Sequence, residues 1–122
     1  MALTKDAILG MDDLPRQKVR VEEWDDDVYV RTLDGEQRQE FKELAAQHEK
    51  GEVSEIDMVA LLVAATVTDE AGGLLFTPED APALRKKNAN ALITIGNVAL
   101  SLNAMTGDDL EELQGNSQTS QS

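Results

Sequence analysis

Residues 88–107 read NANALITIGNVALSLNAMTG, a run without a charge in a chain of 122 residues that carries 24 acidic and 11 basic side chains. Apolar and small residues recur in this run at helical spacing, in two adjacent ridges: Leu92, Ile95, Ala99 and Leu102, then Ile93, Gly96, Leu100 and Ala104. The spacing predicts one long helix over residues 89–105, and the lack of charge leaves two of its faces free for burial. We expect the centre of the fold in this helix.

The segment nearer the N-terminus predicts a β-hairpin. Val19 and Val21 alternate with basic residues, and Val28 and Val30 alternate with other side chains beyond a turn at residues 23–26. Because successive side chains of a strand point to opposite faces, we expect the four valines to share one face of the hairpin.

Helix-start signals divide the middle of the chain. Asp34, with Gln37 three residues later, begins a predicted amphipathic helix. Ser54 begins a second helix through about residue 65, and apolar residues cover most of its circumference, so we expect it to be largely buried.

Shorter segments complete the pattern. Thr4 caps a short N-terminal helix, and residues 67–76 predict a small hairpin or an ordered loop. Residues 77–80, Thr-Pro-Glu-Asp, begin a helix that Pro82 keeps short. A last short helix begins at Thr106.

The fold class that follows is α+β and mostly α-helical: a small N-terminal β-hairpin followed by a compact helical domain with a buried apolar helix. We expect a single domain over residues 1–113. Residues 114–122 lack a large apolar side chain and are expected to form a disordered C-terminal tail.

The net charge of -13 excludes several functions. An acidic surface repels the phosphate backbone and anionic lipid, so we expect no nucleic acid and no membrane as partner. Residues 88–107 hold too many polar side chains to cross a bilayer, and the first residues lack a secretory signal, so we expect a soluble intracellular protein. With no Cys, one His and no nucleophile motif, we expect no enzyme, no catalytic residue, no metal and no cofactor.

Individual polar residues leave alternatives. Asp25, Asp26 and Asp27 suit a solvated turn better than a cation site, because the spacing of a calcium loop is absent. His48 suits packing or a helix C-terminus better than catalysis. Asparagines at positions 90, 97 and 103 form either a face in contact with water or a polar stripe that hydrogen-bonds a partner helix.

One pattern runs from the hairpin into the following helix: Val19-x-Val21-x-x-Trp24-x-x-x-Val28-x-Val30-Arg31-x-Leu33-x-Gly35-x-x-Arg38-x-x-Phe41. It resembles the N-terminal segment of the tail assembly chaperones of long-tailed, siphovirus-type bacteriophages. The order of the later elements is also similar, including the Asp-Glu-Ala-Gly-Gly-Leu-Leu-Phe turn at residues 69–76. The resemblance covers roughly residues 3–113 and rests on packing and turn motifs.

The resemblance implies a function in phage assembly. Such a chaperone is a non-virion factor of the host bacterial cytoplasm, absent from the mature virion. It coats the tape measure protein, keeps it soluble and helps to recruit tail tube subunits, often through a longer form made by translational frameshifting. A homo-oligomer is compatible with the apolar helix. The alternative function is that of an acidic inhibitor or DNA mimic acting by charge.

The physical pattern suggests where a partner would bind. An apolar helix face can lie against a client protein, while the acidic remainder keeps the complex in solution. We therefore expect partner contacts from six apolar residues of the charge-free helix: Leu92, Ile93, Ile95, Val98, Leu100 and Leu102.

Overall fold

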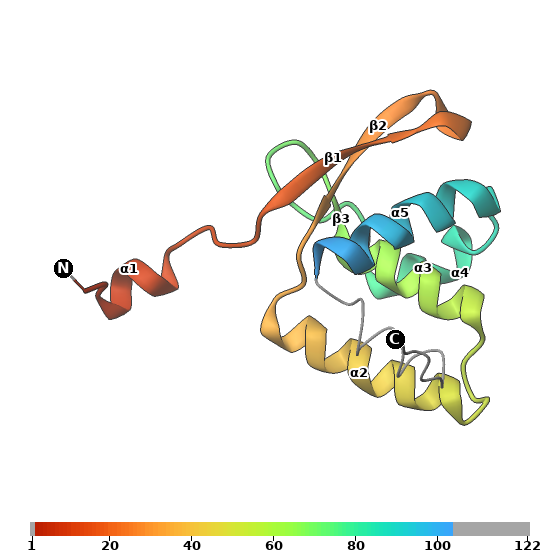
Figure 1. Cartoon of the computed structure of the whole chain (residues 1–122), viewed down its shortest axis with the longest axis horizontal. Helices are drawn as coiled ribbons and strands as arrows, with labels where there is room; N and C mark the ends of the chain where they lie inside the picture. The colour runs from red at the N-terminus through yellow and green to blue at the C-terminus, as the bar shows by residue number, and fades with distance from the viewer. Residues whose placement is uncertain (1, 104–122) are drawn as a thin grey trace, which may run out of the picture.

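The computed structural model describes residues 2–103, in which an antiparallel sheet packs against a layer of helices (Figure 1). The elements in chain order are α1 (Lys5–Leu9), β1 (Arg16–Val21), the 3-10 turn η1 (Glu22–Trp24), β2 (Asp26–Arg31), α2 (Gly35–Glu49), α3 (Glu55–Thr66), β3 (Val67–Thr68), the 3-10 turn η2 (Pro78–Asp80), α4 (Ala81–Leu84) and α5 (Ala89–Leu102). The α+β class, with a small N-terminal hairpin followed by helices, is confirmed.

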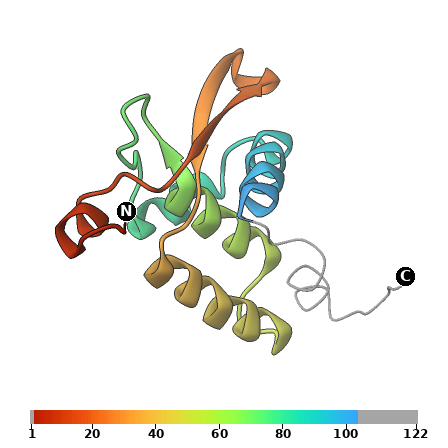
Figure 2. The ribbon, with the colours of Figure 1, turned by 60° about the vertical axis from the view of Figure 1, so that its left-hand side comes forward.

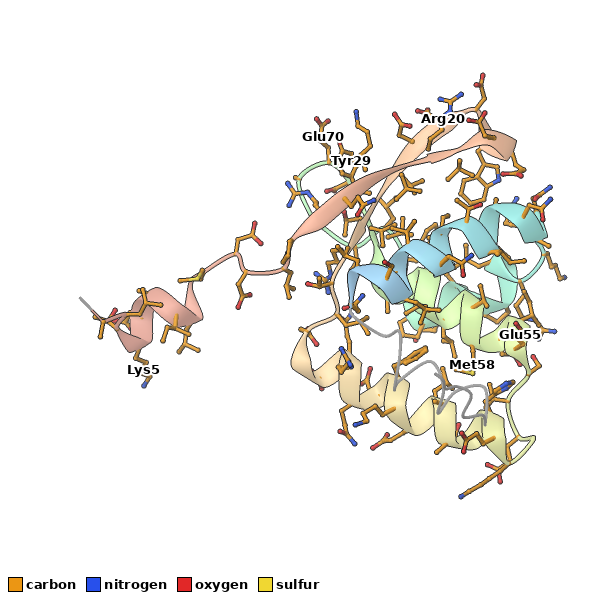
Figure 3. All side chains as sticks on the ribbon, in the orientation of Figure 1. Lys5, Arg20, Tyr29, Glu55, Met58 and Glu70 are labelled. Carbon is orange, nitrogen blue, oxygen red and sulfur yellow. The ribbon has the colours of Figure 1, made fainter. Side chains whose placement is uncertain are left out.

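The hairpin has the register that its valines predict. Val19 pairs with Val28 across the two antiparallel strands, and Val19, Val21 and Val30 are buried. Its turn is a 3-10 turn closed by Asp25, which takes a left-handed backbone conformation with φ of 53°. Arg20 and Tyr29 lie on the face that points away from the helices (Figure 3).

A third strand lies beside β2, where Val67 pairs with Val30 and Thr68 with Tyr29. It comes directly after α3 and turns back through residues 69–73, so the predicted small hairpin at residues 67–76 is present. Its two residues are too few for a sequence pattern to show that it extends the N-terminal sheet.

Helix α5 lies between the sheet and α3 (Figure 2). The side chains of Ala91, Leu92, Ile95 and Ala99 have no exposed surface. Gly96 faces α3, where a Cβ would stand 3.6 Å from a methyl carbon of Val59. Both sides of the charge-free helix are thus in contact with other elements.

Helix α2 lies at the edge of this core. Asp34 caps it, and Gln37 completes the predicted capping box: the Asp34 carboxylate accepts from the backbone N–H of Gln37, and Oε1 of Gln37 accepts from the backbone N–H of Asp34. None of its fifteen residues is fully buried, because only one face of α2 packs against α3, through half-buried side chains such as Phe41 and Leu44.

The beginning of α2 is joined to the end of α5. The backbone N–H of Leu33 donates to Oδ1 of Asn103 over 2.6 Å, and Arg38 donates to the backbone oxygen of Asn103 over 2.9 Å. The side-chain amide of Asn103 also donates to the carbonyl of Ala99. Of the three asparagines, 90 and 97 are exposed, whereas Asn103 is buried and hydrogen-bonds within the chain.

The predicted helix starts at Thr4, Asp34 and Ser54 are confirmed by their capping hydrogen bonds. The segment from residue 77 differs, because it first forms the 3-10 turn η2 and then α4. Helix α4 is short, as predicted, but Pro82 lies in its first turn, where the missing N–H is not needed, so Pro82 is not the residue that ends it.

The remaining expectations concern the C-terminal part. Helix α5 ends at Leu102 with Asn103 as its cap, so its predicted end at residue 105, the helix from Thr106 and the tail at residues 114–122 lie outside the described residues. Within residues 2–103, no helix is long and apolar enough to span a bilayer.

The hydrogen bonds of Asn103 that join the end of α5 to the start of α2 can be tested by substitution. We expect Asn103→Ala to lower the free energy of unfolding by about 1–3 kcal/mol, because it leaves the N–H of Leu33 buried without its acceptor. The exposed Asn97 provides the matched control, and Asn97→Ala should change stability by less than about 0.5 kcal/mol. Urea unfolding followed by circular dichroism measures both, and equal effects would contradict the role given to Asn103.

Candidate functional site

The six residues expected to contact a partner do not share one open face of α5. Leu92 and Ile95 have no exposed surface, because they point into the core between the sheet and α3. Ile93 is 51% exposed. The other three, Val98, Leu100 and Leu102, are half-buried and pack against the core. Helical periodicity identified the apolar faces, but it does not determine which face other elements cover.

A second apolar surface lies between α2 and α3. It is a groove with a volume of about 230 Å³, open to solvent. Three parts of the chain line it: Leu33 ahead of α2 together with one face of α2 (Gln37, Glu40, Phe41, Leu44), the second half of α3 (Leu61, Leu62, Ala64, Ala65), and the segment that leads into η2 with the first residue of that turn (Leu74, Phe76, Pro78). We call this surface the α2–α3 groove.

One side chain fixes the end of the groove near the hairpin. The Oε1 atom of Gln37 accepts from Arg31 over 3.0 Å and from the N–H of Asp34 over 3.1 Å. Its amide nitrogen donates to the carbonyl of Ala65 over 3.4 Å. Gln37 therefore links β2, the start of α2 and the end of α3, and it sets the distance between the two helices at this end.

The loop after β3 forms the third wall. Asp69 holds it, since its N–H donates to the carbonyl of Gly73 over 2.8 Å and its carboxylate accepts from the N–H of Gly73. Gly72 has a φ of 102°, which favours glycine. Beyond the turn, Leu74 lines the groove and is 39% exposed, whereas the neighbouring Leu75 is 53% exposed and lies outside the lining.

The chemistry of the groove suits binding and offers little for catalysis. Its lining is apolar apart from Gln37 and Glu40, and Gln37 already makes the hydrogen bonds described above. No group of carboxylates or histidines within residues 2–103 could hold a metal ion. Nδ1 of His48 donates to the carbonyl of Val53 over 2.7 Å, which joins the end of α2 to the next loop.

A third apolar feature is the N-terminal arm, which we define as residues 3–11. Figure 1 shows α1 set apart from the sheet and helices. Among the described residues of α1, none is buried, and the arm exposes its four large apolar side chains: Leu3, Ile8, Leu9 and Met11. The sequence predicted the helix, but so short a helical pattern does not indicate whether other parts of the chain cover its apolar side chains.

Sequence reasoning did not predict the α2–α3 groove. The groove exists because residues near positions 40, 62 and 75 lie side by side in the fold. Local periodicity does not predict which distant segments of a chain come into contact. The one local signal was the apolar stripe of α2, Phe41 and Leu44, on a helix with few other apolar residues.

Comparison with known proteins adds three findings. No curated protein sequence matches the chain significantly. Among solved structures, the fold is similar to that of the bacteriophage HK97 tail assembly chaperone, with a TM-score of 0.60, 19% sequence identity, and coverage of 80% of this chain and 89% of that chain. At this identity the likeness concerns the fold.

The family model described as "Phage tail assembly chaperone" matches residues 4–115, which is most of the chain. The expected family resemblance, based on the hairpin and the helix after it, is thereby confirmed. The chain belongs to the phage tail assembly chaperone family.

Proposed function

We propose that this chain binds the tape measure protein of a long-tailed phage, keeps it soluble during tail assembly and helps to recruit tail tube subunits. The observation that carries the proposal is the family match over residues 4–115. The chain then acts in the host bacterial cytoplasm, catalyses no reaction and is absent from the mature virion. Recruitment of tube subunits through a longer, frameshifted form and self-association belong to the same proposal.

The α2–α3 groove supports the proposal with a surface of suitable shape. An amphipathic helix binds such a groove by inserting apolar side chains from successive turns. The volume of about 230 Å³ is about one and a half times that of an engineered cavity of about 150 Å³ that holds one benzene molecule, so the groove has room for at least one such side chain. We therefore propose that helical segments of the tape measure protein bind in this groove.

The exposed part of α5 is the second proposed contact. Ile93 is its most exposed large apolar side chain, with Leu100 on the same side of the helix and Val98 and Leu102 on the opposite side. Leu92 and Ile95 contribute by holding α5 in the core, because neither can be reached from solvent in this structure.

The net charge of -13 supports a role in keeping an apolar client in solution. Binding through apolar contacts leaves the acidic side chains in water, where their mutual repulsion opposes aggregation of the complex. The same charge would instead drive binding in an acidic inhibitor or DNA mimic, and the two functions differ in their response to salt.

Co-expression with the tape measure protein of the same phage tests the function. We expect the tape measure protein to become soluble and to co-purify with this chain. The complex should survive about 0.5 M salt, at which the Debye length falls to about 4–5 Å and charge-driven binding is lost. Aggregation of the tape measure protein with both this chain and its frameshifted form would contradict the proposal, and dissociation by salt would favour charge mimicry.

The groove is tested by one pair of neighbouring residues. We expect Leu74→Glu to reduce the amount of co-purified tape measure protein several-fold, because it places a charge in the apolar lining. Leu75→Glu is the control, since Leu75 is more exposed and lies outside the lining. Thermal unfolding shows whether both variants remain folded, and equal loss of binding in the two would exclude the groove as the client site.

The contact of α5 is tested separately. We expect Ile93→Asp to weaken client binding without unfolding the protein, because half of this side chain is already in water. Leu92→Asp should unfold the protein instead, since it buries an unpaired carboxylate in the core. Circular dichroism and the co-purification assay distinguish the two effects, and full binding by folded Ile93→Asp would remove α5 from the client surface.

A further inference from the structure

The segment that connects the N-terminal arm to β1 is held at Pro15, at the end of the α2–α3 groove. The backbone N–H of Thr32 donates to the carbonyl of Pro15 over 3.0 Å, and the next residue, Leu33, lines the groove. Arg16 lies against the loop that leads to Leu74, because a Cβ on Gly72 would stand 3.1 Å from Nη1 of Arg16. Two of the three walls of the groove thus flank the point where the arm leaves the sheet.

The arm has the composition of a ligand for an apolar groove. Its helix α1 has five residues and a side-chain cap from Thr4, and among the described residues of α1 none is buried. A helix of this length is unstable alone in water and needs packing of an apolar face. Ile8 and Leu9 are the large apolar side chains of α1, and both are exposed.

The lengths of the arm and the groove agree. This wall of the groove extends from Leu33, just before α2, to Leu44, and its helical part from Gly35 to Leu44 is about 14 Å long at 1.5 Å per residue. Leu9 is six residues before Pro15, and a chain of six residues spans up to about 20 Å. Ile8 and Leu9 can therefore reach any part of the groove from the position where Pro15 is held.

We propose that the α2–α3 groove is the docking site of the N-terminal arm of the same chain. Residues 3–11 fold over the groove from Pro15 and insert Ile8 and Leu9 beside Phe41 and Leu44. The occupant is a segment of the same molecule because its tether begins at the groove, and a short tether gives an effective concentration of about millimolar without a second copy.

The docked arm competes with a client for the same surface, and this consequence rests on the proposed function of the groove. If the arm covers the groove in nine molecules of ten, the apparent affinity for a client helix falls about tenfold. The free chaperone then shields its apolar groove from water and from other copies, and a client segment of high affinity displaces the arm.

Disulfide trapping tests the docking without a client. The chain has no native Cys, so two introduced thiols report on one contact. We combine Met11→Cys with Glu40→Cys, which places the second thiol in the groove lining. The matched control combines Met11→Cys with Gln39→Cys, on the same turn of α2 but outside the lining. Both pairs are oxidised with diamide in dilute full-length protein.

The result expected is an intramolecular disulfide that forms several-fold faster in the Met11–Glu40 pair than in the Met11–Gln39 pair. Equal rates would overturn the proposal, because they indicate an arm that samples both faces of α2 alike. Disulfides between molecules only, seen as dimers on a non-reducing gel, would also overturn it. Neither outcome depends on whether the tape measure protein binds.

The competition is measured with a second variant. Ile8→Asp combined with Leu9→Asp removes the two inserted side chains and leaves the core intact, since both are exposed. We expect this variant to retain the tape measure protein more strongly than the unaltered chain, by up to about tenfold in apparent affinity. Weaker retention would identify the arm as a client contact and overturn the competition, even where disulfide trapping supports the docking.

Discussion

The structure depends on the burial of one uncharged helix from two sides. Helix α5 lies between the sheet and α3, and the side chains of Leu92 and Ile95 are completely removed from water. Burial of a leucine or isoleucine contributes about 1.5–3 kcal/mol, so these residues and their neighbours supply much of what holds the layers together. The hairpin valines and the apolar face of α3 are the surfaces that α5 covers, and Asn103 at its end connects the core to the start of α2.

This arrangement leaves α2 with a different role. Its side chains pack on one face only, and none of them is fully buried. The groove between α2 and α3 follows from that incomplete packing, with Gln37 fixing one end and the loop at Leu74 forming the outer wall. This open apolar groove, in a chain of the tail assembly chaperone family, is the surface at which we propose that the client binds.

Local chemistry explains what the sequence could predict. The caps at Thr4, Asp34 and Ser54 join residues three positions apart, and the valines alternate within one strand. Both features can therefore be predicted from a short stretch of sequence. The position of β3, the covered side of α5 and the groove each depend on segments far apart in sequence. Leu92 and Ile93 are adjacent aliphatic residues of similar size in the same helix, yet Leu92 lies in the core and Ile93 is half exposed. The family pattern predicted the fold, and only the arrangement in space shows which apolar residues remain available.

The one-sided packing of α2 has a consequence for the range of segments that the groove accepts. A helix without a fully buried side chain can move away from its neighbour at a free-energy cost below that of global unfolding. Because Gln37 and Asn103 hold the beginning of α2, such a movement opens the groove near Leu44 while the hydrogen bonds at Leu33 persist. The width of the groove can therefore adjust to bulky or small side chains. One small chain would then accept segments of the proposed client that differ in the size of their side chains.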